Sequence, residues 1–366
     1  MTILIFALVL IALIVVHEFG HFVAAKWSSM RVDEFGLGYP PKAYGKKIGE
    51  TEYTLNWLPF GGFVKIFGED PVQGQAPAPR SFTSRPRILQ ALVLVAGIAM
   101  NLLFAYVLIT VTLGMGTTRA LTEEEARMVP DARLAVASVL PESPAAEAGF
   151  KQGDLILAAS ADDETFNGND ASAFTAFVAE EGAGRELSFV VEGQDGAQRT
   201  LTATPEAGVV ASAPERAALG VGLAVVGTHA TPWWQAPIEG AVLTWELTKQ
   251  TGIALLQFFG SIFTLSADLA QVSGPVGIAG AVGNASEDGL ASLLTITALI
   301  SINLALINLL PIPALDGGRL LFVIIESIIR RPIPPTFANA VNGIGFLALI
   351  LLMLVVTASD IFKIVG

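Results

Sequence analysis

Long apolar runs alternate along the chain with stretches rich in polar residues, glycine and proline. A helix of about 20 apolar residues spans the hydrocarbon core of a bilayer. Four runs reach that length, and with their flanks they occupy residues 1–26, 88–114, 290–318 and 337–366. The first run has neither a basic start nor a small-residue cleavage site after it, so we expect a retained helix. The pattern therefore predicts a polytopic α-helical membrane protein with about four transmembrane helices.

Residues 27–87, between the first two spans, alternate polar and apolar residues between glycines and prolines. This pattern predicts short strands at residues 52–57 and 62–66, followed by a linker over residues 71–87. The hairpin either folds back toward the membrane, where protein or water must cover its backbone, or is an ordinary cytoplasmic hairpin. In the first arrangement, an exposed strand edge could receive an extended peptide.

Residues 115–206 contain the pattern of an inserted α+β domain, which covers about residues 132–206. Predicted strands there alternate with a short helix that ends at a glycine and with a longer amphipathic helix. Residues 207–289 are predicted to be a connector with a Pro-Trp-Trp interfacial anchor, followed by amphipathic helices on the membrane surface. The stretch 236–269 is long and apolar, but a fifth crossing there would conflict with the distribution of basic residues.

Charge is distributed unevenly around a formal net value of -12. Basic residues concentrate in residues 26–87 and in the loop expected at 319–336, whereas residues 115–235 are acidic. Because cytoplasmic loops carry the excess of Lys and Arg, we place the basic segments in the cytoplasm, and residues 115–289 and both termini outside it. No basic stripe indicates nucleic acid as a partner, and the expected partners include the lipid bilayer.

Two histidines and a glutamate lie inside the first apolar run, in the order His-Glu-Phe-Gly-His at residues 17–21. Residues four apart share one face of a helix, so His17 and His21 can bind one metal ion with Glu18 beside them. Ionisable groups at this depth are costly and need partners, a metal or a water-filled cavity. The alternative is a histidine pair hydrogen-bonded within a helix bundle, which leaves Glu18 unexplained.

The scarcity of histidine and the absence of cysteine limit which residue type can be the third metal ligand. The chain has no cysteine, and its third histidine, His229, stands in a polar segment typical of a surface. We therefore expect a carboxylate. Asp316 is the candidate, because two prolines and two glycines break the helix around it at the end of the third span. Together with His17 and His21 it would hold one Zn²⁺ and leave one coordination position open.

Asn303 and Asn308 are amides in the apolar helix that leads to this break. Such groups need hydrogen-bond partners inside a membrane. They either hold a substrate backbone or the oxyanion, or they join neighbouring helices, and the sequence leaves both functions open.

These motifs together resemble the site-2 protease family of intramembrane zinc metalloproteases, closest to the bacterial regulator-of-sigma-E protease type. Residues 17–21 match the HExxH motif of the family, and residues 308–318 match its long NxxPxPxLDGG motif. Further similarities extend over nearly the whole chain, with a membrane-associated β-region at 36–38, 59–65 and 68–70, a second helix at 97–105, a PDZ domain at 143–156, and the segment before the third helix at 273–279.

The resemblance implies a zinc metalloendopeptidase that hydrolyses peptide bonds in transmembrane segments of single-span membrane proteins. An anti-sigma factor already trimmed outside the membrane, or a remnant signal peptide, would be such a substrate. The resemblance also implies a location in the bacterial inner membrane. The distribution of basic residues places the active site near the cytoplasmic face and the PDZ domain outside the cytoplasm. Glu18 would be the general base. The residues expected to bind substrate are Gly36, Gly38, Tyr53, Gly62, Asn303 and Asn308.

One feature departs from the best-known sigma-E regulators, which carry two tandem PDZ domains, because only one such pattern is found here. Its carboxylate-binding loop is not recognisable, so the ligand of the domain stays unknown. Two functions outside this family remain as alternatives, a membrane metal transporter or sensor and a catalytically silent PDZ scaffold. The complete set of metal ligands and base favours the protease.

Overall fold

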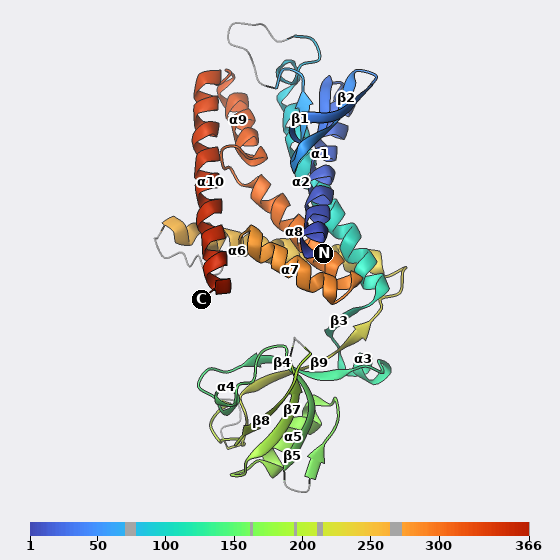
Figure 1. Cartoon of the computed structure of the whole chain (residues 1–366), viewed down its shortest axis with the longest axis vertical. Coiled ribbons are helices and arrows are strands. Elements are labelled where there is room, and N and C mark those ends of the chain that lie inside the picture. The colour runs from blue at the N-terminus through green and yellow to red at the C-terminus, as the bar shows by residue number, and fades with distance from the viewer. Residues whose placement is uncertain (70–77, 162–163, 194–195, 211–214, 264–272, 366) are drawn as a thin grey trace. The chain divides into compact units, whose positions relative to one another are not determined.

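The computed structural model describes residues 1–69, 78–161, 164–193, 196–210, 215–263 and 273–365 (Figure 1). The chain divides into two compact units, each described by itself. One contains residues Met1–Gly114 and Pro232–Gly366, and the other is Met115–Thr231.

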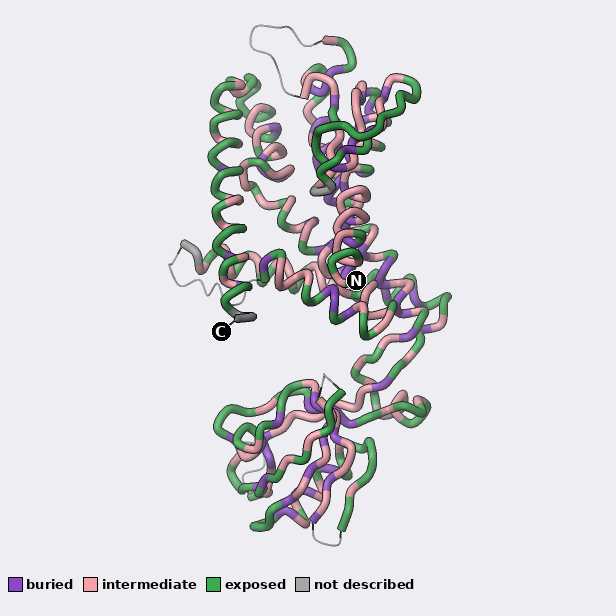
Figure 2. The backbone as a smooth tube through the Cα atoms, viewed as in Figure 1, coloured by how far each residue is buried: buried purple, intermediate pink, exposed green. Residues whose placement is uncertain are grey.

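Four helices of the first unit are long and apolar enough to cross a membrane, which confirms the predicted number of spans. They are α1 (Thr2–Trp27), α2 (Arg87–Met115), α8 (Leu290–Leu309) and α10 (Pro335–Val365). In the most apolar window of α10 only 11% of the residues are buried, and the helix is exposed along most of its length in Figure 2. Its apolar surface is therefore left for lipid.

Two further helices, α6 (Ala236–Phe263) and α7 (Pro275–Glu287), run across the direction of α10 in Figure 1. Neither is among the described helices that qualify as spans. Helix α6 packs through Ala236 on α2 and α8, and α7 packs through Val282 on α1. The stretch 236–269 is thus a single helix as far as Phe263, and its last residues lie outside the described part of the chain.

The loop expected at residues 319–336 is mostly helical, because α9 spans Asp316–Ile329. Leu320 and Val323 lie about one turn apart on α9 and pack against the cluster formed by α1, α2 and the β-region. This tertiary burial, which the basic residues of the segment conceal in the sequence, stabilises the helix.

The β-region consists of β1 (Val32–Ile48) and β2 (Thr51–Ile66). Residues 34–37 of β1 lie between two parts of β2, since they pair with residues 52–55 and also with residues 62–65. The hairpin folds back on α1, where Phe22 contacts Phe35 and Tyr53. The end of the 68–70 motif and the first part of the expected linker, residues 70–77, lie outside the described residues. In the rest of the linker, the 3-10 turn Phe82–Ser84 precedes α2.

The second unit is built on a seven-stranded sheet whose order is β3-β9-β4-β5-β7-β8, with β6 paired to β5. Its core includes Leu134, Phe174 and Phe189, all almost completely buried. The strands are β3 (Thr117–Ala120), β4 (Arg133–Val139), β5 (Leu155–Ala161), β6 (Glu164–Phe166), β7 (Leu187–Glu192), β8 (Gln198–Ala203) and β9 (Val221–His229), and the helices are α3 (Glu123–Met128), α4 (Pro144–Ala148) and α5 (Ala171–Glu181).

The predicted boundary of this domain at residue 206 was too early. Strand β9 lies in the segment interpreted as a connector, yet it pairs with both β3 and β4 inside the sheet. Val221, Leu223 and Val225 alternate along β9 and pack against the core. This period of two is the ordinary signal of a half-buried strand, and the surrounding glycine and alanine residues obscure it.

Candidate metal centre

Helix α1 and the first residue of α9 bring three ligating side chains together. The Oδ2 atom of Asp316 lies 3.0 Å from Nε2 of His17 and 3.2 Å from Nε2 of His21. The two Nε2 atoms are themselves 3.2 Å apart. Within the described residues, this is the one group of three or more His, Cys, Asp or Glu side chains close enough to hold a metal ion.

The breaks predicted around Asp316 explain how a residue so distant in sequence reaches α1. Helix α8 ends at Leu309, and α9 begins at Asp316 after a turn in which Ala314 has the left-handed φ of 74°. The backbone N–H of Ala314 donates to Oδ1 of Asn342 in α10 over 3.3 Å. Gly317 is required by close packing, because a Cβ there would lie 2.2 Å from the backbone oxygen of Leu310.

Two ion pairs hold α9 against the rest of the first unit. Arg319 pairs with Glu69 after the β-region, and Glu326 pairs with Arg87 of α2 over 2.6 Å. Since Arg319 follows Asp316 by less than one helical turn, the first pair fixes the end of α9 that carries the third ligand.

Helix α2 supplies the surroundings of both imidazoles. Nδ1 of His21 lies 2.8 Å from the backbone oxygen of Val93, and Nδ1 of His17 lies 3.2 Å from Nδ2 of Asn101. Gly97 lies between these two partners, and a Cβ there would be 2.4 Å from Nε2 of His21. The absence of a side chain at Gly97 thus makes room for the two rings.

Glu18 is half-buried beside the histidines and faces the β-region. The backbone of Val64 in β2 interacts with its carboxylate. A Cβ built on Gly62 would lie 3.4 Å from Cγ of Glu18 and 3.0 Å from Ile14. The last part of β2 therefore passes directly beside the candidate general base.

The other predicted substrate-binding residues of the β-region have different neighbours. Gly36 pairs with Phe63 next to this part of β2, and Gly38 bends β1 with a φ of 79°. Tyr53 packs on Phe22 and Phe35 instead of on the metal ligands.

The two asparagines of α8 also differ from each other. The Asn303 side chain is exposed and donates to the backbone oxygen of Leu299 in its own helix over 3.1 Å. No contact of Asn303 with the metal ligands is found among the described residues, so its assignment to the site gains no support. Asn308 is half-buried in the last turn of α8, just before the break that leads to Asp316.

The sequence interpretation left Asn101, Val93 and Gly97 out of the site. Asn101 could have been found in the same way as the asparagines of α8, since it too is an amide in the middle of an apolar span. Val93 takes part through its backbone oxygen, which no sequence pattern identifies.

The donor set fits zinc. Two imidazoles and one carboxylate form a common set of three protein ligands for catalytic zinc, which leaves a fourth position for water or substrate. Each histidine also has a partner at its other ring nitrogen, as metal-ligating histidines almost always do.

Comparisons with known proteins agree with this geometry. The model of peptidase family M50 matches residues 5–352. A protein of Clostridium perfringens named as a candidate zinc metalloprotease is 37% identical over 96% of this chain and 95% of its own length. The zinc metalloprotease RasP of Geobacillus kaustophilus is 29% identical over 98% of this chain and 97% of its own.

The regulator of sigma-W protease RasP of Bacillus subtilis is likewise 29% identical, over 98% of both chains. The family match and these relatives cover nearly the entire chain, including both halves of the metal centre. The chain therefore belongs to peptidase family M50, the site-2 proteases, and is a zinc metalloprotease.

Proposed function

We propose that this protein hydrolyses peptide bonds within the transmembrane segments of single-span membrane proteins. The observation that carries the proposal is the convergence of His17, His21 and Asp316, with Glu18 beside them, on helices long and apolar enough to span a membrane. A catalytic site built from such helices would lie at the depth of the bilayer, where it meets the transmembrane segments of other proteins.

In the proposed mechanism, His17, His21 and Asp316 hold zinc, and Glu18 handles the protons. Zinc in such a site supplies a Lewis acid that activates water and polarises the scissile carbonyl. The Glu18 carboxylate accepts a proton from the attacking water and then delivers it to the leaving amine. The same carboxylate interacts with the backbone of Val64 in β2.

A transmembrane helix has its carbonyl groups hydrogen-bonded internally, so a substrate must unwind before its carbonyl can be attacked. Residues 62–66 of β2 pair with β1 on one side, and no described strand pairs with their other side. We propose that the unwound segment adds to this edge as an extra strand. The proximity of Gly62 to Glu18 supports this position, and we retain Gly36 and Asn308 as further candidate contacts.

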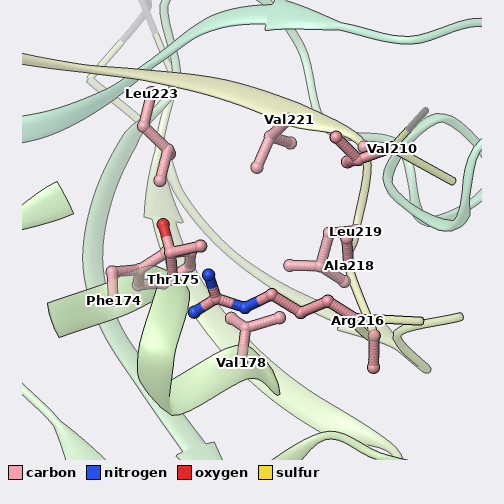
Figure 3. Close-up of a pocket in the computed structure, with 11 residues that line it drawn as sticks. Phe174, Thr175, Val178, Val210, Arg216, Ala218, Leu219, Val221 and Leu223 are labelled. Carbon is pink, nitrogen blue, oxygen red and sulfur yellow. The ribbon is translucent and has the colours of Figure 1, made fainter. Parts of the chain in front are cut away.

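The second unit is proposed to be a PDZ-type docking module outside the cytoplasm. A cavity of about 240 Å³ lies between α5 and the start of β9, lined by Phe174, Val178 and Leu219. The Arg216 side chain extends across it toward Thr175 (Figure 3). An apolar lining with one basic group suits an extended apolar segment that carries a carboxylate, which favours docking over a simple size filter.

The docking role has its own test. Arg216→Glu should slow cleavage of a substrate that retains its extracytoplasmic tail, and should leave unchanged the cleavage of a substrate trimmed to its span. Equal rates for wild type and variant on the tailed substrate would contradict docking at this cavity.

The same observations support a location and a set of partners for this proposal. The basic residues of the β-region support an active site near the cytoplasmic face of a bacterial inner membrane. The name of the Bacillus subtilis relative, a regulator of sigma-W protease, supports a membrane-bound anti-sigma factor as substrate. Remnant signal peptides have the same single-span form and are the second substrate class of the proposal.

The mechanism is tested with Glu18→Gln in proteoliposomes that contain a single-span substrate. The variant should bind zinc and unfold at the same temperature as wild type, yet cleave no substrate. Turnover close to that of wild type would contradict the assignment of Glu18. Zinc uptake into the vesicles without cleavage would instead favour the transporter alternative.

A further inference from the structure

Asn101 is a buried amide of which only one polar atom has a hydrogen-bond partner among the described residues. It lies in the middle of α2, has 0% of its surface exposed, and places Nδ2 3.2 Å from Nδ1 of His17. Its Oδ1 atom is also buried and has no hydrogen-bond partner among the described residues. One of the two amide atoms is therefore without a partner, which is unfavourable in an apolar helix. The contact with His17 decides whether that atom is the oxygen or the nitrogen.

The chemistry of His17 indicates which amide atom faces it. Its Nε2 atom points at Asp316 and His21, and it must keep a free lone pair to bind zinc. The proton of the neutral ring is then on Nδ1, which becomes a hydrogen-bond donor. A donor cannot pair with the Nδ2 group of Asn101, which also donates. Exchanging the two amide atoms changes no heavy-atom position. Oδ1 then faces the Nδ1–H group of His17, and the amide NH₂ group takes the position that has no partner among the described residues.

We propose that Asn101 is a positioning residue of the metal centre, whose Oδ1 accepts a hydrogen bond from Nδ1–H of His17. This bond fixes the tautomer and the orientation of the first zinc ligand. The inference rests on the proposed function, because it assumes zinc bound by Nε2 of His17.

The second histidine has an equivalent partner, which supports this arrangement. Nδ1 of His21 lies 2.8 Å from the backbone oxygen of Val93, an atom that can only accept. Val93, Gly97 and Asn101 follow one another at four-residue steps, so they share one face of α2. That face meets the two histidines, which are themselves four residues apart on α1. This face of α2 therefore provides a hydrogen-bond acceptor for each ring, and Gly97 leaves space for the rings between the two acceptors.

The backbone around Asn101 is also held in place. Oγ of Ser301 in α8 donates to the backbone oxygen of Asn101 over 2.8 Å, and both residues are 0% exposed. This bond joins α2 to α8 at the level of the metal centre. The Asn101 side chain therefore projects toward His17 from a fixed position.

The experiment measures the zinc affinity of the full chain in detergent, by competition with a chromogenic chelator. Asn101→Leu keeps the number of side-chain heavy atoms but has no acceptor, and it should weaken zinc binding about 10- to 100-fold. Asn101→Asp retains an acceptor and loses the amide donor, and its affinity should stay within about threefold of wild type or increase. Thr112→Val is the matched control, because Thr112 is a buried polar residue of α2 that bonds to Leu108 and should leave the affinity unchanged.

Two results would overturn the inference. Wild-type affinity in Asn101→Leu would show that the amide does not position His17, and an equal loss in Asn101→Leu and Asn101→Asp would show that the donor matters. If Asn101→Leu does not fold, Asn101→Ala, which is smaller and also lacks an acceptor, takes its place in the comparison with Asn101→Asp. A wild-type protein that binds no zinc would contradict the proposed function itself, which separates the two failures.

Discussion

Adding a single methyl group at Gly97 should damage the metal centre although no ligand is replaced. The Cβ of Gly97→Ala would lie 2.4 Å from Nε2 of His21 and 2.9 Å from Cε1 of His17. Ordinary contacts begin near 3.4 Å, so the rings or the backbone of α2 must move by about 1 Å. Zinc sites tolerate deviations of only about 0.2 Å in ligand distance.

The expected consequence is a large loss of turnover together with a loss of stability. A misplacement of about 1 Å in a catalytic site reduces the rate on the order of 100-fold, which corresponds to about 2.7 kcal/mol of transition-state stabilisation. Overpacking of the helix contact itself should lower the free energy of unfolding by about 1–3 kcal/mol.

The assay measures bound zinc per protein and the initial rate on a single-span substrate in proteoliposomes. Gly343→Ala is the matched control, because Gly343 also lies in a predicted span and a Cβ there meets nothing within 4 Å. Stoichiometric zinc and a rate within about threefold of wild type in Gly97→Ala would refute the reasoning that the two rings fill the space beside Gly97.

Three further predictions concern the surroundings of the site. Arg80 and Lys26 lower the pKa of Glu50 to about 2 from 4.5, so the stability this carboxylate contributes is present above pH 4.5 and is lost as the pH falls toward 2. In melting scans, the stability difference between wild type and Glu50→Gln should therefore shrink over that range, and a difference independent of pH would contradict this. Arg319→Gln breaks the pair with Glu69 and should weaken zinc affinity about two- to fivefold in a chelator competition, whereas unchanged affinity would argue against a function of the pair in placing α9. Removing zinc with a chelator should abolish cleavage, and adding zinc back should restore it; full activity after removal would exclude a catalytic metal.

The membrane architecture could be predicted because it depends on local composition. Each of the four spans is a contiguous apolar run, and the structure places a suitable helix at each. The convergence of His17 and His21 with Asp316 was also predictable, since the two histidines share a helix face and the break around Asp316 exposes a carboxylate. Such residues can be recognised in the sequence because charged groups in apolar helices are rare.

Features that depend on tertiary contacts were missed. Strand β9 and helix α9 are stabilised by partners distant in sequence, and their own segments resemble a connector and a basic loop. The asparagines show the same limit, because Asn303 bonds within its own helix while Asn101 faces His17. Sequence alone cannot distinguish these two amides, since the difference lies in which helix packs against each one.

The central claim is that the peptide bond is cut inside the membrane-spanning segment of the substrate. The most direct measurement is mass spectrometry of the fragments released from a single-span substrate by the purified protein with zinc in proteoliposomes, with Glu18→Gln as the inactive control. The account predicts a scissile bond within the apolar segment, in the half nearer its cytoplasmic end. Fragments cut only outside that segment, or identical fragments from Glu18→Gln, would contradict it.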